Sequence, residues 1–446
     1  MPLRRPIGSE PWERPAPADR AARSEAIELR VRTASARIAD AGLRRLLEGT
    51  LTNTLDTTIV AGGTGERPNT FVLTGDIDAM WLRDSTAQVW PYLASVRDDR
   101  ELDLLIRGVI HRQSDQVLLD SYANAFRFDD APGEWAGDET DMRPGVHERK
   151  WEPDSHLAFF RLSAGYAQAS GTLRPFDATW REALRAALRT LRTEQRLDGT
   201  SPYRFRRPDG DPTDQVPNDG LGVPTQPNGM IHGAFRPSDD ASELPLNVAV
   251  NLALAAALDS VAPVAAAVGD EILAIDARSL ASRIRDGVAR DGLVRQAGTT
   301  VWAYEVDGLG RRLLMDDANA PSLISLPYFG ACDVADPIYV ATRRSVLSPE
   351  NPWLFSGAVG EGVGSPHTGP RRIWPIAIAM RGLTATSVEE RLEAIRLLGA
   401  SHAGTYLAHE SFDVDDPAQF TRPWFAWANA LVGELLERAA LDGLLA

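Results

Sequence analysis

The chain has 446 residues, of which 43% are hydrophobic and 24% charged, an ordinary globular composition that excludes a disordered, collagen-like or coiled-coil chain. The formal net charge is −15, from 47 basic and 62 acidic residues. A surface this acidic repels nucleic acid and anionic lipid, so we expect neither nucleic acid nor a membrane as a partner. The sequence has no run of about 18 apolar residues and no secretory signal, so we expect a cytoplasmic protein.

The predicted elements begin after a Pro-rich N-terminal arm, which we expect to be flexible over residues 1–18. Aliphatic residues at helical spacing predict an amphipathic helix within 19–49, and a Thr-rich stretch with turn glycines predicts β structure within 51–73. A short hairpin is expected over 299–314, around Asp307-Gly308. Further helical patterns cover residues 80–98, 101–127, 154–170, 177–196, 240–259, 267–290, 336–347, 374–383, 386–400 and 422–444.

These elements predict an all-α fold of about a dozen helices, many of them in adjacent pairs. The strand content is too small and scattered for a parallel sheet, and no repeat of 20–50 residues indicates a solenoid. A toroid of paired helices, an (α/α) barrel with long loops and a short β-hairpin or two, fits this pattern as a single domain over 19–446. An open irregular bundle fits it almost as well. The irregular stretch 200–240 has a length that is often functional.

Common catalytic signatures are missing from the sequence. There is one cysteine, Cys332, and one lysine, Lys150, which excludes a disulfide within the chain and leaves Lys150 as the only candidate for a Schiff base. The seven histidines form no HExxH motif, and neither GxSxG nor GxxxxGK[ST] occurs. We interpret GEGVGS at 360–365 as a tight turn, because no clear strand precedes it. We therefore expect no metal and no cofactor.

Carboxylates beside aromatic residues gather instead in several loops. Sugar rings stack on aromatic side chains, sugar hydroxyls bond to Asp, Glu, Arg and Asn, and paired carboxylates supply a general acid and base. Any one of these residues alone could be a helix cap, a core residue or a surface charge. Together they favour a glycan pocket, and the candidates are Asp78, Trp81, Arg83, Asp84, Glu152, Asp154, Arg236, Asp239, Asp240, Asn319, His367, Glu410 and Trp424.

The same loops resemble glycoside hydrolase family 125, the metal-independent exo-α-1,6-mannosidases. The motifs that carry the resemblance occur in the same order as in the family, from residue 50 to the C-terminus. It implies an (α/α)6 barrel that hydrolyses terminal α-1,6-linked mannose of oligosaccharides with inversion and without a metal. The motifs that carry it are GDIDAMWLRDSTAQVWPYL (75–93), KWEPDS (150–155), FRPSDDA (235–241), DDANAPSLISLPYFG (316–330), GSPHTG (364–369) and HESF…TRPWFAWAN (409–429).

The resemblance also implies roles for individual residues. Glu410 is then the candidate general base, and either Asp239 or Asp240 is the general acid, whose pKa the neighbouring carboxylate would raise. His409 or Arg422 would keep Glu410 ionised. Arg83, Asp84 and His367 would hold mannose hydroxyls, Trp81 or Trp424 would stack on the sugar, and the loop 200–240 would close the pocket. Asp78, Glu152, Asp154, Arg236 and Asn319 complete the predicted substrate site.

Two other classes of protein fit some of these features. An isoprenoid-type cyclase on a helical toroid also uses Asp-rich, aromatic-lined sites, but its DDxxD or DxDD motif does not occur here. A non-catalytic glycan-binding protein would tolerate the loss of either carboxylate, whereas this chain keeps both candidates.

Overall fold

The structure is a computed structural model that describes residues 10–296 and 298–446. The predicted flexible arm falls partly outside this range, since nothing is described for residues 1–9. Within residues 10–18 the chain is anchored to the protein at two points: Trp12 is buried, and Arg14 pairs with Glu28 at 2.6 Å and with Asp56 at 2.8 Å.

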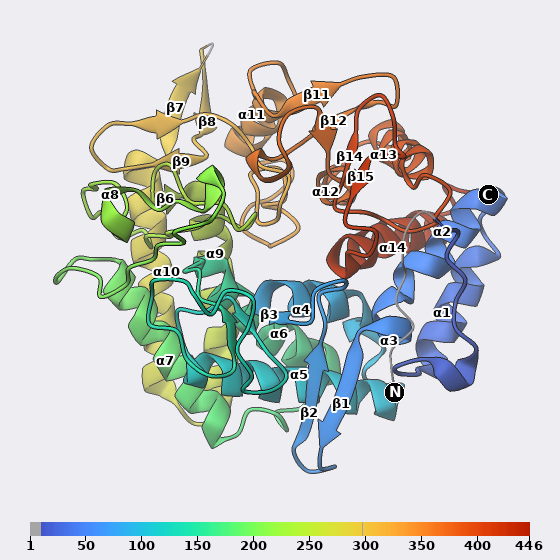
Figure 1. Ribbon diagram of the computed structural model, residues 1–446, viewed down its shortest axis with the longest axis horizontal. Coiled ribbons are helices and arrows are strands. Elements are labelled where there is room, and N and C mark those ends of the chain that lie inside the picture. The colour runs from blue at the N-terminus through green and yellow to red at the C-terminus, as the bar shows by residue number, and fades with distance from the viewer. Residues whose placement is uncertain (1–9, 297) are drawn as a thin grey trace.

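Helices follow one another around a common centre, and the N-terminal helices meet the C-terminal helix (Figure 1). In the inner ring each of α14, α4, α6 and α9 packs on the next, and α12 packs on α14. Outer helices pair with them, and α1 and α2 contact α14 to join the two ends of the chain. The inner helices are α4 (Leu82–Val89), α6 (Pro153–Ser170), α9 (Val248–Ala267), α12 (Pro375–Leu383) and α14 (Ala426–Leu441), and the others are α1 (Glu25–Ser35), α2 (Ala41–Leu51), α5 (Arg100–Leu119), α7 (Ala178–Glu194), α10 (Glu271–Asp291), α11 (Pro337–Val346) and α13 (Val388–Ser401).

The two rings differ in their apolar pattern. In the outer helix α7, buried Trp180, Leu184, Leu188 and Leu191 recur at helical spacing and leave a charged outer face. The inner helix α9 is apolar almost all round. It has the length and mean hydropathy, 1.7, of a membrane-spanning helix, but 78% of that stretch is buried inside the protein. Its composition is therefore that of a core helix.

The expected single helix within 19–49 is two helices. The Asp40 side chain accepts a hydrogen bond from the Leu43 N–H at 2.8 Å and so caps a new helix, α2. Downstream, α3 (Asn53–Thr57) precedes an antiparallel hairpin of β1 (Ile59–Gly63) and β2 (Pro68–Val72), which confirms the β structure expected in this stretch.

Short antiparallel sheets join loops that lie far apart in sequence. The expected hairpin around Asp307-Gly308 is present as β9 and β10, and β6 extends its sheet. The strands are β3 (Met80–Trp81), β4 (Ala125–Phe126) and β5 (Val146–Glu148); β6 (Leu246–Asn247), β9 (Glu305–Val306) and β10 (Arg312–Leu313); β7 (Leu293–Gln296) and β8 (Thr299–Trp302); β11 (Leu354–Ser356) and β12 (Glu361–Val363); and β13 (Arg372–Ile373), β14 (Ser411–Asp413) and β15 (Phe420–Thr421).

The segment GEGVGS is a strand rather than the expected tight turn. Its residues Glu361–Val363 form β12, which pairs with β11. The glycines are needed for close packing: a Cβ on Gly362 would lie 2.5 Å from Ile373 Cγ2, and one on Gly364 would lie 2.2 Å from the Arg372 carbonyl oxygen. These glycines let β12 approach β13.

Short helical segments complete the described chain. They are η1 (Pro17–Asp19), η2 (Trp90–Ser95), η3 (Pro212–Asp214), α8 (Pro217–Gly220) and η4 (Pro366–Thr368). The stretch 200–240 contains η3 and α8 but is otherwise irregular, as its Pro, Gly and Asp content predicts.

Candidate active site

A cavity of about 290 Å³ gathers most of the predicted site residues. Its walls come from the loop before α4, the 236–240 loop, the segment after β10, η4 and the loops around β14 and β15. The predicted residues that line it are Trp81, Arg83, Asp84, Asp239, Asn319, His367 and Glu410.

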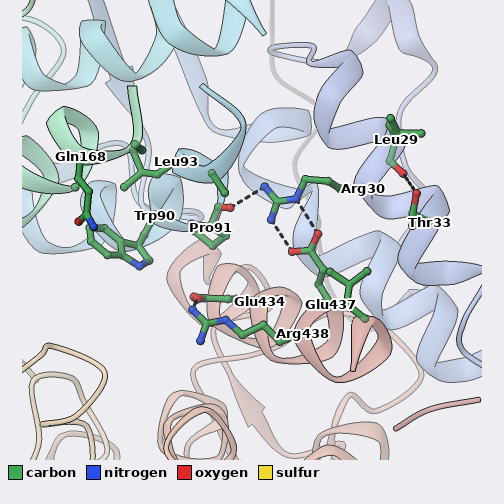
Figure 2. Close-up of a pocket in the computed structure, with 14 residues that line it drawn as sticks. Leu29, Arg30, Thr33, Trp90, Pro91, Leu93, Gln168, Glu434, Glu437 and Arg438 are labelled. Carbon is green, nitrogen blue, oxygen red and sulfur yellow. Dashed lines mark hydrogen bonds and ion pairs between the residues drawn. The ribbon is translucent and has the colours of Figure 1, made fainter. Parts of the chain in front are cut away.

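A larger cavity, of about 700 Å³, lies between α1, η2, α6 and α14 (Figure 2). Its two carboxylates are engaged in ion pairs: Glu437 accepts from Arg30 at 2.6 Å, and Glu434 accepts from Arg438. Arg30 also donates to the Pro91 carbonyl at 2.9 Å. The bonds of Arg30 join α1 to α14 and η2, so we assign this cavity a structural role and not the chemistry.

Asp239 stands at the tip of a tight loop. The Arg236 N–H donates to the Asp240 carbonyl at 2.8 Å, and the Asp239 N–H donates to the Arg236 carbonyl at 2.9 Å. Asp239 has a φ of +67°, a left-handed conformation that side chains other than glycine adopt at a cost. The Lys150 ammonium donates to the Asp239 carbonyl at 2.7 Å. The surrounding bonds thus hold a strained residue toward the cavity.

Arg236 anchors this loop from behind. Its guanidinium donates to both carboxylate oxygens of Glu305 in β9, at 2.6 and 3.0 Å, and it is only 2% exposed. Arg236 does not line the cavity, so the structure corrects its predicted role: it positions Asp239 rather than touching substrate.

Arg83, in the first turn of α4, lies among four carboxyl groups. It is 2.6 Å from Glu152, 3.1 Å from Asp154, 2.9 Å from Asp239 and 3.6 Å from Asp84. Glu152 and Asp154 are buried at the start of α6 and do not line the cavity. Their predicted contact with substrate is thereby corrected, because Arg83 lies between them and the pocket.

The charge state of Asp239 depends on this cluster. Burial alone would raise its pKa, but the Arg83 guanidinium, the hydrogen bond to Glu152 and the charge of Lys150 hold the pKa of Asp239 well below its usual range. Burial, together with the charges of Asp239 and Asp154, raises the pKa of Glu152 well above its usual range despite Arg83. The carboxyl that perturbs Asp239 is therefore Glu152, and not Asp240 as expected.

Asp240 turns away from the cavity. Its Oδ1 lies 2.9 Å from Nδ1 of His367. Burial would lower the pKa of His367, but the hydrogen bond and charge of Asp240 raise it to about 9, so the ring is a cation at neutral pH. Asp240 thus places a positive imidazole in the pocket wall, and Asp239 is the acid candidate that faces the pocket.

Glu410 lies just before β14 and is 6% exposed. Its N–H donates to the Thr421 carbonyl at 3.2 Å, which ties it to β15. Arg422 Nη1 stands 3.7 Å from Glu410 Oε1, while its Nη2 donates to Asp76 at 2.6 Å. Arg422 therefore supplies the positive charge expected beside this carboxylate.

His409 does not supply that charge. Its ring stacks on Phe420 with centroids 3.7 Å apart, and its Nε2 is 3.1 Å from the Thr405 hydroxyl. Burial lowers the pKa of His409 to about 4, so it is neutral at physiological pH. His409 supports the β14–β15 loop.

The aromatic wall differs from the prediction. Trp81 lines the cavity, but Trp424 is fully buried and donates its indole N–H to Asn53 at 3.0 Å, so it offers no stacking face. The exposed Asp78 also lies outside the lining. The predicted site list omits four aromatic residues that do line the cavity: Trp135, Trp374, Phe425 and Trp427.

A second missed group forms the outer part of the cavity. Arg207 stacks on Trp135 with its guanidinium carbon 3.7 Å from the ring centroid, and Lys150 pairs with Asp214 at 2.6 Å. Glutamate and aspartate from the same loops complete the lining, namely Glu134, Glu148 and Asp211, along with His147. Lys150 stays charged, because Glu148, Asp239 and Asp214 raise its pKa against the effect of burial, which argues against a Schiff base.

Asp239 and Glu410 stand on separate loops of one polar, aromatic-lined pocket in a toroid of paired helices, and this arrangement defines a glycoside hydrolase of the (α/α) barrel class. Over residues 10–296 and 298–446, no group of three or more His, Cys, Asp or Glu side chains could hold a metal ion. The sequence model of the metal-independent α-mannosidases, GH125, matches residues 40–437. The chain belongs to this family, and it is an α-mannosidase.

Several known proteins are similar to this chain. The meiotically up-regulated gene 157 protein of Schizosaccharomyces pombe is 36% identical, over 96% of this chain and 88% of the relative. A metal-independent α-mannosidase of Streptococcus pneumoniae, solved in a non-productive complex with α-1,6-mannobiose, is 38% identical with a TM-score of 0.89, over 94% of this chain and 99% of that one. A bacterial glucoamylase complexed with acarbose shares only the fold, at 12% identity and a TM-score of 0.52, over 82% of this chain and 49% of that one.

Proposed function

We propose that this α-mannosidase is an inverting exo-enzyme that removes terminal α-1,6-linked mannose from mannose oligosaccharides, with Asp239 as general acid and Glu410 as general base. The observation that carries the proposal is that Asp239 and Glu410 line one cavity from separate loops, whereas Asp240 turns to His367. The α-1,6-mannobiose bound to the S. pneumoniae relative supports an α-1,6 linkage in the substrate.

In this mechanism Asp239, whose pKa rises as the bound sugar displaces water from it, gives a proton to the glycosidic oxygen as the bond to C1 breaks. Glu410 takes a proton from the water that attacks C1 from the opposite face. Arg422 is 3.7 Å from Glu410 and keeps a positive charge beside the base. The cationic His367 and the amide of Asn319 line the pocket and are suited to holding sugar hydroxyls.

The exo mode requires a pocket that accepts only a chain end. The segment 207–214 belongs to the 200–240 loop that we predict closes the pocket, and it lines the cavity with Arg207, Asp211 and Asp214. Glu134 and Trp135 come from the loop between β4 and β5 and line the same part. We assign this outer part to the sugar that leaves.

A panel of α-1,2-, α-1,3- and α-1,6-linked mannobioses, assayed with and without EDTA, tests the proposal. We expect hydrolysis of the α-1,6 compound and the same rate in EDTA, because both chemical roles fall to carboxyl groups. Loss of activity in EDTA with recovery on adding Ca²⁺ or Zn²⁺ would contradict a metal-free mechanism. No hydrolysis of the α-1,6 compound would contradict the proposed substrate.

A further inference from the structure

We propose that the outer part of the cavity selects the leaving glycan by its charge. It favours a neutral or cationic group beyond the cleaved bond and disfavours an anionic one, such as a phosphorylated or carboxylated sugar. This inference rests on the proposed function, in which the outer part holds the sugar that leaves. Its basis is a pair of exposed carboxylates, Glu134 and Asp211, which line the cavity from two different loops.

Backbone and side-chain bonds join these two loops into one wall. The Glu139 N–H donates to the Arg206 carbonyl at 2.8 Å, and the Arg206 N–H donates to the Glu139 carbonyl at 3.2 Å. Next to this bridge, the Arg207 guanidinium donates to both carboxylate oxygens of Asp138, at 2.8 and 2.7 Å. The loop between β4 and β5 is therefore held against the loop before η3.

The two cations that line the outer part are paired with other carboxylates. Arg207 pairs with Asp138 at 2.7 Å, with Glu148 at 2.9 Å and with Asp214 at 3.4 Å. Lys150 pairs with Asp214 at 2.6 Å and lies 3.5 Å from Glu148. The side chains of both cations are nearly buried, at 5% and 3% exposure, so they present little charge to a ligand.

Glu134 and Asp211 have no such partner. In the part of the chain that the structure describes, neither carboxylate forms an ion pair or a hydrogen bond. Both residues are exposed and also line the cavity, so they stand at its mouth, where it opens to solvent. His147 adds no positive charge there, since burial lowers its pKa, and Arg206 pairs with Glu139 and lies outside the lining. The mouth therefore carries excess negative charge.

The same wall has features that suit a sugar. The half-buried ring of Trp135 lines it and can pack against a sugar face. His147 also lines it and is 4% exposed, and neither of its ring nitrogens has a hydrogen-bond partner among the described residues. Buried polar groups without a partner are rare, and in a cavity wall they indicate where a bound molecule completes the bonding.

A glycan held in the pocket has to pass the mouth. In an α-1,6-linked substrate the leaving sugar is attached through its O6, and the rest of the glycan continues from its C1 toward solvent. A charge on that continuation lies near Glu134 and Asp211, and like charges repel. Because both carboxylates are exposed, the effect is modest and salt screens it.

Three glycosides of α-1,6-mannobiose test the proposal. The methyl, 2-aminoethyl and carboxymethyl glycosides share the disaccharide and differ in the charge at C1 of the leaving sugar. At an ionic strength of about 0.01 M we expect kcat/KM to fall in the order aminoethyl, methyl, carboxymethyl, with about tenfold between the extremes, mainly through KM. In about 1 M NaCl, where the Debye length is about 3 Å, the three values should agree within about twofold.

Two double variants locate the effect. Glu134→Gln with Asp211→Asn should reduce the tenfold ratio at low salt to less than about threefold. Asp130→Asn with Asp209→Asn removes the same charge from exposed positions on the same two loops but outside the lining, and should keep the ratio.

Equal kcat/KM for the three glycosides at low salt, or a preference for the carboxymethyl glycoside, would overturn the inference without any variant. So would a ratio that survives in Glu134→Gln with Asp211→Asn, or one that both double variants reduce equally. A wild type that hydrolyses none of the three glycosides would instead refute the proposed function.

Discussion

Glu410→Gln is expected to lower kcat for α-1,6-mannobiose by about 10² to 10⁴, the contribution of a general base. The amide keeps the shape of the side chain and its backbone bond to Thr421, but it cannot take a proton from water. The loss should appear on an activated aryl mannoside as well, because water must be activated whatever group leaves. Steady-state kinetics on both substrates measure it.

A matched control is Glu437→Gln in the cavity of Figure 2, where the carboxylate pairs with Arg30. This change removes an ion pair outside the catalytic cavity, so it should lower the thermal midpoint and leave kcat intact. If Glu410→Gln behaved like the control, with a normal rate per folded molecule, Glu410 would be a structural residue.

Asp239→Asn is expected to separate the two substrate types. Without an acid, kcat for α-1,6-mannobiose should fall by about 10² to 10⁴, while a dinitrophenyl mannoside should lose far less, because its leaving group departs as an anion. Comparing kcat for the two leaving groups checks this directly.

Asp240→Asn serves as the neighbouring comparison. Asp240 raises the pKa of His367 to about 9. Removing the Asp240 carboxylate should therefore leave the imidazole largely neutral at pH 7 and weaken its hydrogen bonds to sugar hydroxyls. We expect a raised KM on both substrates rather than a leaving-group effect. If Asp240→Asn showed leaving-group selectivity and Asp239→Asn showed none, Asp240 would be the general acid instead of Asp239.

The order of elements and the loops that build the site could be predicted from sequence, because the motifs of these loops place carboxylates beside aromatic residues or arginines. The direction of each side chain could not. Asp239 and Asp240 are adjacent, yet the left-handed φ of Asp239 sends one to the cavity and the other to His367. Trp424 and Phe425 are adjacent in an extended segment, where side chains alternate, and Phe425 faces the pocket.

Contacts between distant segments also escaped prediction. Lys150 and Asp214 meet 64 positions apart in sequence, and Arg236 meets Glu305 at a separation of 69. Trp135 lies in an irregular loop without helical or strand periodicity, so no pattern marked it as part of the pocket. The Arg207 guanidinium stacks on the Trp135 ring, and this contact forms only when the fold brings the two loops together.

The central claim is that water displaces the leaving group in a single step, with Asp239 as acid and Glu410 as base. The most direct test of this claim is the configuration of the first mannose released. NMR of the early reaction mixture reads the anomeric proton before mutarotation. Single displacement at an α-linkage predicts β-mannose, from two carboxyl groups about 6.5–9.5 Å apart with water between them. Initial α-mannose would contradict the account, because it requires a covalent intermediate with Glu410 as a nucleophile instead of a base.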